Sequence, residues 1–494
     1  MVFPVIGGTQ DAEFNVSNSV RFDDGGSERL YFDQGSGDDT TARRKWTFST
    51  WIKRSDLNTS AVLYGAGSAS TDMFQLLMQN DGDANRIIIQ NRVSGTNNLH
   101  LVTTNSFRDT SAWYHIFARF DSTQGSASNR LVAYVNGVEV GSNYGGYGVD
   151  QTGSITQNEE DLEIGDSGTR ISIGYSPNGT SSFFDGYMAE THLLIGSAKA
   201  HTDFGETNDN GVWVPIKTSF ATSDYGSNGF KLEYKQTGTS ANSSGIGADT
   251  SGNDNHFTVQ NLNAQNVTED VPTNNFCTFN PRFTGQRGTF SEGNTKLVTN
   301  VQGSVNYGQS VIGTFLLTAG KWYWEIEVDA VGSGGNVGIG VNERIDAGIY
   351  NNGHNNLGST GTAFYKSDGN IQIGSGSNIS NTSYTSGDII SVALDLDNSR
   401  IYWAKNGVYQ SNGSGTGNPS TGANPITLTS SYDDGWVVFC SKDDTSNNAT
   451  FIANFGNYPV AVSSGNTDGK YGTFEYEVPT GFYALCTKRL GEFG

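Results

Sequence analysis

Acidic side chains that alternate along a short segment are the first candidates for chemistry in this chain. Residues 159–166 read EEDLEIGD, and an extended backbone would place Glu159, Asp161 and Glu163 on one face. Retaining glycoside hydrolysis uses two carboxyl groups about 5–5.5 Å apart on either side of a cleft. The same alternation suits a solvated edge strand. We therefore expect no catalytic residue here and interpret the chain as a protein without enzyme activity.

Other catalytic patterns are missing from the sequence. Residues 325–329 read EIEVD and also alternate acids, at Glu325 and Glu327, but within a strand pattern of bulky aromatic and aliphatic residues. None of the six histidines stands near a nucleophile-elbow motif. We expect His115 and His192, which lie in predicted strands, to be structural. The glycine-rich segment 374–378 precedes no predicted helix, so a phosphate-binding loop is not indicated.

One acidic turn has the composition of a calcium site. Residues 80–85 read NDGDAN and bring Asn80, Asp81, Asp83 and Asn85 into one turn. Calcium prefers such carboxylate and amide oxygens, although Asp/Gly turns also form without metal. Calcium is the one cofactor that the sequence suggests.

Two loops combine glycine with aromatic and amide side chains, residues 141–150 (GSNYGGYGVD) and 349–358 (IYNNGHNNLG). Flat rings together with amide hydrogen bonds are the combination that sugar recognition uses, and binding residues concentrate on loops. The alternative is a pair of flexible turns. The candidate ligand-binding residues are Tyr144, Tyr147, Asp150, Tyr350, Asn352, His354 and Asn355.

Composition excludes several classes of function. The 494 residues carry 29 basic and 50 acidic side chains, a net charge of −21, which repels phosphate backbones and argues against nucleic-acid binding. No apolar run reaches the 18 residues of a membrane span, so we expect no membrane insertion. The N-terminus has no signal-peptide pattern. Three cysteines without metal-binding spacing predict buried thiols.

The elements that must position these residues are strands. The chain has 64 glycines, and short apolar runs alternate with Gly/Ser/Asn turns, a pattern typical of all-β proteins. Residues 387–409 predict a strand pair, with Val392 and Leu394 facing a core and Asn406-Gly407 supplying a type I′ turn. Residues 130–140 repeat this construction with Asn136-Gly137. Two β-sandwiches in one chain are indicated.

The first half resembles the concanavalin A-like, laminin-G-type jelly roll. The segments that carry the resemblance are WTFSTWIKR (46–54), WYHIFARFDS (113–122), LVAYVNGVEV (131–140) and FDGYMAETHLLIG (184–196). They place this sandwich at residues 17–204, after an N-terminal arm at residues 1–16.

The second half resembles a SPRY domain, which is itself a concanavalin A-like sandwich. The matching segments are KWYWEIEVDA (321–330), VGIGV (337–341), the 387–409 element and ATFIANFG (449–456). We expect this sandwich at residues 286–494. Residues 205–285 then form a Gly/Ser/Asn-rich connector with short strands, which we expect to pack on one or both sandwiches.

The connector suggests a source. Its runs SGNDNHFTVQNL and VPTNNFCTFNP (251–281) resemble a connector common in tail and fibre proteins of marine phages. This resemblance implies a virion protein on the exterior of the particle, a tail or head fibre or appendage. Its expected partners are a host cell-surface glycan or protein, other virion proteins through the N-terminal arm, and further copies of itself.

Two other functions remain open. A decoration or adaptor protein would contact only other virion subunits. A depolymerase of host polysaccharide would need paired carboxylates, with Asp161 and Glu163 as the residues to test. A SPRY adaptor of the animal type fits less well, because no other segment resembles the usual companion domains.

Overall fold

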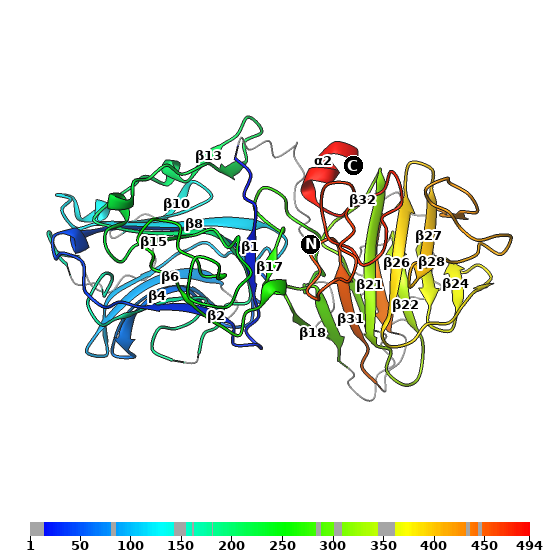
Figure 1. Cartoon of the computed structure of the whole chain (residues 1–494), viewed down its shortest axis with the longest axis horizontal. Coiled ribbons are helices and arrows are strands. Elements are labelled where there is room, and N and C mark those ends of the chain that lie inside the picture. Colours follow the sequence, from blue (N-terminus) through cyan, green and yellow to red (C-terminus); the bar gives the residue numbers. More distant parts are fainter. Residues whose placement is uncertain are drawn as a thin grey trace. The chain divides into compact units, whose positions relative to one another are not determined.

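The computed structural model describes residues 14–80, 85–142, 155–160, 163–179, 181–282, 288–300, 309–343, 361–430, 435–442 and 447–494. These residues form two compact units, one within residues 10–273 and one that includes residues 274–494 (Figure 1). Both units are built from antiparallel sheets, so the predicted all-β fold is confirmed.

The unit at residues 10–273 contains two large sheets. In spatial order, sheet A comprises β10 (Val138–Ser142), β9 (Leu131–Val135), β8 (Trp113–Asp121), β3 (Lys45–Arg54), β12 (Gly186–Ile195), β1 (Ser19–Phe22) and β17 (Val267–Thr268), and β15 (Phe230–Leu232) also pairs with β12. Sheet B comprises β16 (Thr258–Gln260), β2 (Arg29–Asp33), β11 (Arg170–Ile173), β4 (Ala61–Ala69), β5 (Asp72–Gln79), β6 (Arg86–Val93) and β7 (Thr96–Val102).

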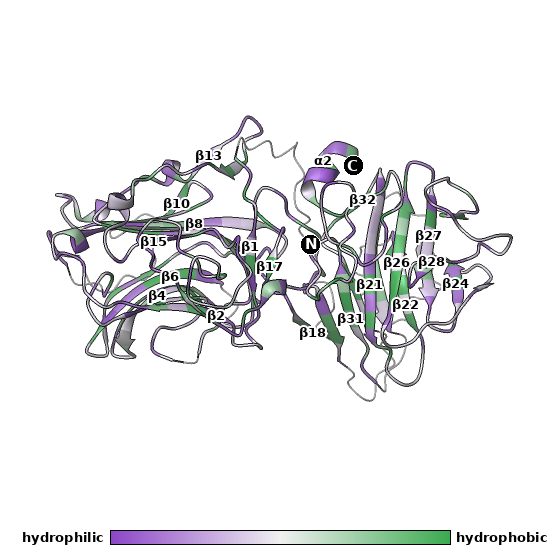
Figure 2. Cartoon of the chain, viewed as in Figure 1, coloured by the Kyte–Doolittle hydropathy of each residue, from purple (hydrophilic) through white to green (hydrophobic). Residues whose placement is uncertain are grey.

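Alternation along the strands builds the core between these sheets. Trp46, Phe48 and Ile52 of β3 belong to one buried cluster with Tyr64 of β4 and Phe74 of β5. Because successive side chains of a strand point to opposite faces, the intervening residues of β3 lie on the outer face of sheet A. Figure 2 shows the apolar residues concentrated along the strands.

Residues 205–273 belong to this unit, whereas the sequence analysis assigned 205–285 to a connector between sandwiches. Their strands β15, β16 and β17 extend sheets A and B, and β13 (Gly205–Thr207) forms a hairpin with β14 (Trp213–Pro215). The buried residues that they add to the core are Phe230, Leu232, Tyr234, Ile246, Phe257 and Leu262. A Gly/Ser-rich segment can join a core in this way because a few large side chains suffice to anchor it.

The second unit also has two sheets and ends in α2 (Thr487–Phe493). Sheet C comprises β18 (Gly288–Ser291), β19 (Lys296–Thr299), β31 (Thr450–Asn454), β21 (Lys321–Ala330), β26 (Asp388–Asp395), β27 (Arg400–Lys405) and β28 (Val408–Tyr409), joined by β29 (Ile426–Thr427) and β32 (Tyr483–Ala484). Sheet D comprises β20 (Gln309–Ile312), β30 (Val437–Lys442), β22 (Val337–Asn342), β23 (Thr362–Lys366), β24 (Asn370–Ile373) and β25 (Ile379–Ser380).

The two Asn-Gly turns have the same geometry in both units. Asn136 and Gly137 have φ values of 49° and 76°, and Asn406 and Gly407 have 47° and 79°. Each asparagine side chain accepts a hydrogen bond from a neighbouring strand, from the amide of His115 in one unit and of Ile389 in the other. Positive φ at both positions is what a type I′ turn requires.

In each unit a segment after the sandwich covers the outer face of the sheet that carries this hairpin. Trp213 lies against Gly137, and Tyr476 lies against Gly407.

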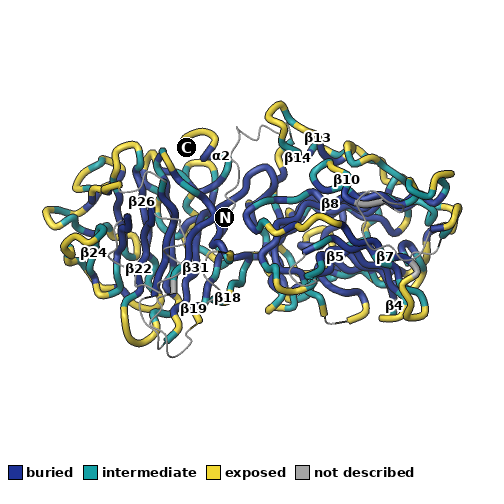
Figure 3. Tube along the Cα trace, turned by 180° about the vertical axis from the view of Figure 1, so that it is seen from behind, coloured by how far each residue is buried: buried dark blue, intermediate teal, exposed yellow. Residues whose placement is uncertain are grey.

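The sequence predicted that only one face of 387–409 meets a core, but Ala393 and Asp395 on its other face are also buried. The reason is that further residues cover this face as well: Phe276, Phe474 and Phe482 pack with Ala393. Figure 3 shows buried residues running along the strands and exposed residues gathered in the loops.

Candidate functional site

The predicted ligand-binding residues belong to two loops that lie almost wholly outside the described part of the chain. Tyr144, Tyr147, Asp150, Tyr350, Asn352, His354 and Asn355 all lie outside the described residues. Of the predicted calcium ligands, Asp81 and Asp83 also lie outside them. Asn80 donates a hydrogen bond from Nδ2 to the carbonyl oxygen of Asn58 (2.7 Å), and Asn85 is buried. Both predictions therefore stay predictions.

The acidic segment 159–166 does not form the strand that the depolymerase alternative needs. None of its described residues is in a strand, and Glu163 has a φ of 59°, outside the β region. Glu160 instead accepts a hydrogen bond from Nε of Arg44 (2.8 Å), and Glu159 accepts one from the backbone amide of Thr156 (2.5 Å). Asp161 lies outside the described residues, so the depolymerase alternative stays an alternative, without an extended backbone at Glu163 to support it.

Glu325 of the second acidic segment is a buried structural group. Its carboxylate accepts hydrogen bonds from the Tyr323 hydroxyl (2.8 Å), the Asn454 amide group (3.1 Å) and the backbone amides of Glu475 and Tyr476 (2.9 and 2.8 Å). Burial raises its pKa, and these donors act in the opposite direction. The carboxylate thus holds the covering segment on sheet C, which explains a buried acid among the aromatic and aliphatic residues of this strand.

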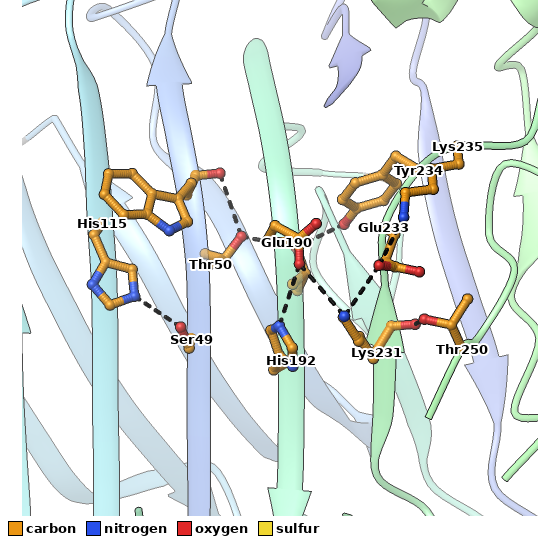
Figure 4. Close-up of polar contacts among 12 residues, drawn as sticks. Ser49, Thr50, His115, Glu190, His192, Lys231, Glu233, Tyr234, Lys235 and Thr250 are labelled. Carbon is orange, nitrogen blue, oxygen red and sulfur yellow. Dashed lines mark hydrogen bonds and ion pairs between the residues drawn. The ribbon is translucent and has the colours of Figure 1, made fainter. Parts of the chain in front are cut away.

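A serine–histidine pair lies on the outer face of sheet A (Figure 4). Ser49 Oγ lies 2.8 Å from His115 Nε2. The indole Nε1–H of Trp213 donates to His115 Nδ1 (3.1 Å), so the ring proton resides on Nε2 and His115 donates to Ser49. Burial lowers the pKa of His115 to about 3, and His201 and His192 lower it further. The imidazole therefore cannot take the serine proton, and the predicted structural role of His115 agrees with its contacts.

Beside this pair, β12 carries a bulge that gathers charged groups. Ala189 pairs with Trp51 and His192 with Ser49, so Glu190 and Thr191 both stand opposite a single residue of β3. Glu190 has a φ of 46°. Such a bulge re-aims side chains.

The glutamate at this bulge bridges two strands. The Glu190 carboxylate lies 3.7 Å from His192 Nε2 and 3.8 Å from Lys231 Nζ of β15, as Figure 4 shows. Lys231 also contacts Glu233 (3.1 Å). His192 packs against Phe204, Phe220 and Tyr225, and the ion pair between Glu190 and Lys231 attaches β15 to sheet A.

The outer face of sheet B carries polar side chains in a row that crosses six strands. The strand registers align Tyr31, Ser172, Gly65, Gln75, Gln90 and His100 in spatial order. Gln90 Nε2 donates to Gln75 Oε1 (2.6 Å), and Gln75 Nε2 donates to Ser176 Oγ (2.9 Å). The amides are thus held in fixed orientations, while Gln90 and His100 keep part of their surface exposed.

At the β2 end of this row, three side chains form an exposed planar group. Arg170 makes a two-point contact with Asp33, with Nε–Oδ1 at 2.6 Å and Nη2–Oδ2 at 2.9 Å. Its guanidinium lies over the Tyr31 ring, 4.2 Å from the centroid. The hydrogen bond that Arg170 donates to Asp33 raises the pKa of Arg170. The Arg170 and Asp33 side chains are 39% and 60% exposed, so both offer hydrogen-bonding atoms to solvent.

We name these residues the sheet B platform: Tyr31, Asp33, Gln75, Gln90, His100 and Arg170. Gln75 is itself buried and orients Gln90, and Pro177 lies over Gly65 between the two ends of the row. The platform offers donors, acceptors and a ring edge on a rigid sheet, without paired unsatisfied carboxylates or an activated nucleophile. This chemistry suits binding of a hydroxyl-rich ligand. The sequence analysis missed it, because Gln75 and Gln90 stand singly within the mainly apolar strands DMFQLLMQ (72–79) and RIIIQNRV (86–93).

No finished metal centre is present in the part of the chain that the structure describes, since three or more His, Cys, Asp or Glu groups do not converge there as metal ligands. Nor does any described helix have the length and apolar character needed to cross a membrane.

Comparison with known families identifies both sandwiches. Residues 24–196 match the family described as the concanavalin A-like lectin/glucanases superfamily, and residues 321–419 match the SPRY domain. The chain therefore carries a Laminin_G_3 (concanavalin A-like) domain followed by a SPRY domain, which confirms these two resemblances. No curated protein matches the chain.

Several solved structures resemble parts of the chain. The SPRY domain of human HERC1 is 16% identical, with a TM-score of 0.27, over 35% of this chain and 96% of that one. The Ruminococcus gnavus IT-sialidase CBM40 is 12% identical, with a TM-score of 0.25, over 35% and 91%. The heptameric SAP-like pentraxin from Limulus polyphemus is 13% identical, with a TM-score of 0.25, over 38% and 80%.

Proposed function

We propose that this chain is a non-enzymatic binding protein on the exterior of a phage particle, a fibre or appendage whose first sandwich binds a glycan of the host surface. The observation that carries the proposal is the sheet B platform, with its exposed Tyr31–Arg170–Asp33 group and its oriented amides. The virion location rests on the resemblance of residues 251–281 to phage fibre connectors.

The negative charge of the chain favours one class of glycan ligand. The net charge of −21 repels polyanions at long range, so a neutral, hydroxyl-rich glycan is a better ligand than an acidic polysaccharide. The hydroxyl groups of neutral sugars donate to carboxylate oxygens, accept from guanidinium groups and do both with amides, and the platform presents all three groups. The proposed partners also include host proteins, other virion proteins and further copies of the chain.

The test is binding of the full chain to a panel of immobilised neutral and acidic glycans, followed by substitution in the platform. We expect Tyr31→Ala and Asp33→Ala each to weaken binding of the selected glycan about tenfold, the loss of about 1.4 kcal/mol. Asp33 is on the surface, so its loss should change stability by about 1 kcal/mol at most.

Asp166→Ala is the matched control, because Asp166 is also an exposed partner of an arginine, Arg43 (2.9 Å), but lies outside the platform. If no glycan binds, or if the platform variants bind as well as the Asp166 variant, the platform is not the ligand site. A purely structural virion role would then be the better account.

A further inference from the structure

Three of the six histidines of the chain meet at one interface in the first unit. Residues 201–216, which we name the sheet A cover, contain η3 (His201–Asp203), β13 and β14. His201 belongs to this cover, whereas His115 and His192 belong to the strands β8 and β12 beneath it. The ring of His115 lies 5.9 Å from that of Trp213 of the cover, and the ring of His192 lies 5.4 Å from that of Phe204.

Side chains, rather than a backbone ladder, attach the cover to sheet A. β13 and β14 pair with each other, and among the described residues no backbone hydrogen bond joins residues 201–216 to a strand of sheet A. Phe204 packs on Phe117 of β8, with ring centroids 5.7 Å apart, and His201 stacks on Tyr134 of β9 at 4.1 Å. The cover can therefore lift away as a local opening that breaks no strand pairing of either large sheet.

One hydrogen bond of this attachment depends on the protonation state of a histidine. The indole Nε1–H of Trp213 donates to His115 Nδ1 over 3.1 Å, and the other ring nitrogen, Nε2, lies 2.8 Å from Ser49 Oγ. A neutral imidazole has one acceptor nitrogen, whereas the protonated ring has two N–H donors and no acceptor. Protonation of His115 would thus set two N–H donors against each other at a fully buried contact.

The surroundings of His115 offer no negative charge to offset its protonation. Burial lowers the pKa of His115, and the two charges that lower it further are those of His201 and His192, which become cationic in acid themselves. The other two rings have charged and titratable neighbours of both signs: Glu190, Glu233, Lys231 and the Tyr225 phenol at His192, and Asp203, Glu139, Arg119 and the Tyr134 phenol at His201. His115 is therefore the ring at which acid acts most directly against the closed cover.

We propose that acid releases the sheet A cover, with the hydrogen bond between Trp213 and His115 as its latch. While the cover is closed, His115 is buried and neutral. Once the cover lifts, the imidazole meets water and is free to take a proton, so opening is favoured as the pH falls. The opened face presents Phe117, Tyr134 and His115 on a sheet whose strands remain paired. The cover is then a pH-controlled lid over an aromatic surface, and it acts independently of glycan binding on sheet B.

The two states of His115 give the size of the effect. Burial holds its pKa at about 3 in the closed state, against about 6.5 for an exposed histidine. The opening equilibrium constant therefore rises about tenfold for each pH unit below 6.5, or about 30-fold between pH 7.5 and pH 5.

The experiment is hydroxyl-radical footprinting of the full chain at pH 7.5, 6 and 5, with mass spectrometry to measure the oxidation rate of each aromatic side chain. Phe117 and Phe204 are buried at the closed interface, with 1% and 2% of their surfaces exposed. We expect their oxidation rates to rise about tenfold from pH 7.5 to pH 5. Trp46 and Phe74, which lie in the core between the two sheets, should stay protected throughout.

Two pairs of variants test the latch itself. His115→Asn keeps an acceptor for Trp213 but does not titrate, so it should remove most of the pH response, whereas the matched His100→Asn change on sheet B should keep it. Trp213→Phe keeps a ring against His115 without an N–H donor and should raise the oxidation of Phe117 already at pH 7.5. Its matched control is Trp113→Phe, which removes an indole donor to Asp270 (3.1 Å) outside the cover and should leave Phe117 protected at that pH.

Three results would overturn the proposal. Phe117 and Phe204 could be as protected at pH 5 as at pH 7.5. Trp46 and Phe74 could be oxidised in step with them, which would indicate unfolding of the whole unit rather than release of the cover. His115→Asn could respond to acid as strongly as the unaltered chain; if that variant fails to fold, Trp213→Phe decides the question, and full protection of Phe117 at pH 7.5 in that variant would rule out the latch.

Discussion

His115 illustrates how a titratable residue becomes part of a core. Its ring lies between Trp51 and Trp213, with centroid distances of 4.8 and 5.9 Å, and both ring nitrogens are hydrogen-bonded. The folded state holds it neutral, with a pKa of about 3 against about 6.5 for an unperturbed histidine. Below pH 6.5 the unfolded chain therefore binds more protons than the folded protein does.

This difference in proton binding makes the folded protein less stable as the pH falls. The contribution of His115 to the free energy of unfolding is present above pH 6.5 and decreases as the pH falls toward 3, by up to about 1.4 kcal/mol per pH unit. Burial lowers the pKa of His192 as well, so it adds to the same slope. Denaturant unfolding between pH 7.5 and pH 5 measures this slope.

The control for this prediction is His115→Gln. That variant should be less stable at pH 7.5, because glutamine cannot stack between the two indoles, but its stability should fall less steeply with acid. Equal slopes in the two proteins would show that His115 does not carry the effect.

Individual site residues were the least predictable from the sequence. The structural roles of His115 and His192 follow from their positions in predicted strands. The sheet B platform was not predicted, because Arg170 is far from Tyr31 along the chain and only the register of β11 with β2 brings them together.

Among the elements, the Asn-Gly hairpins were the most predictable, since their turn chemistry is local. The contacts of these turns with aromatic side chains were not predictable. A Cβ at position 137 would lie 2.4 Å from Trp213, and one at position 407 would lie 2.7 Å from Tyr476. The bulge at Glu190 was also invisible, because its cause is pairing with β3 on one side and β15 on the other.

Replacing either turn glycine with alanine should loosen its cover. Gly137→Ala and Gly407→Ala combine a positive φ with a steric clash, and we expect each to lower the free energy of unfolding by about 2–4 kcal/mol. Gly387→Ala is the matched control, because Gly387 has a φ of 86° but open space around it, and it should cost about 1 kcal/mol. Chemical denaturation of the three variants measures the difference, and equal losses would mean that the aromatic contacts contribute nothing.

At the scale of the whole molecule, the order of domains was predictable and the extent of the first was not. Strand patterns and family resemblance both located two sandwiches. The sequence predicted that strands of residues 205–273 pack on a sandwich, but not how much of the first core they supply, because composition averages over the few large residues that are buried.

Truncated fragments test where the first domain ends. A fragment of residues 10–273 should fold with a cooperative thermal transition. A fragment of residues 10–204 loses six large buried side chains, a deficit on the order of 10 kcal/mol, and should be unfolded or aggregated. Circular dichroism and a dye that reports exposed apolar surface compare the two. A stable, cooperative 10–204 fragment would show that the later residues are only attached to a complete sandwich.

In each unit a segment of the chain itself occupies a sheet face, as a bound ligand would. Trp213 with its neighbours, and Tyr476 with its neighbours, already occupy sheet faces that would otherwise be open. Because each cover is tethered, its effective concentration at that face is high, and an outside molecule would have to displace it there. Selection for a new ligand can therefore act on the platform of sheet B and on loops at little cost in stability, whereas the covered faces of sheets A and C are committed to holding the sandwiches together.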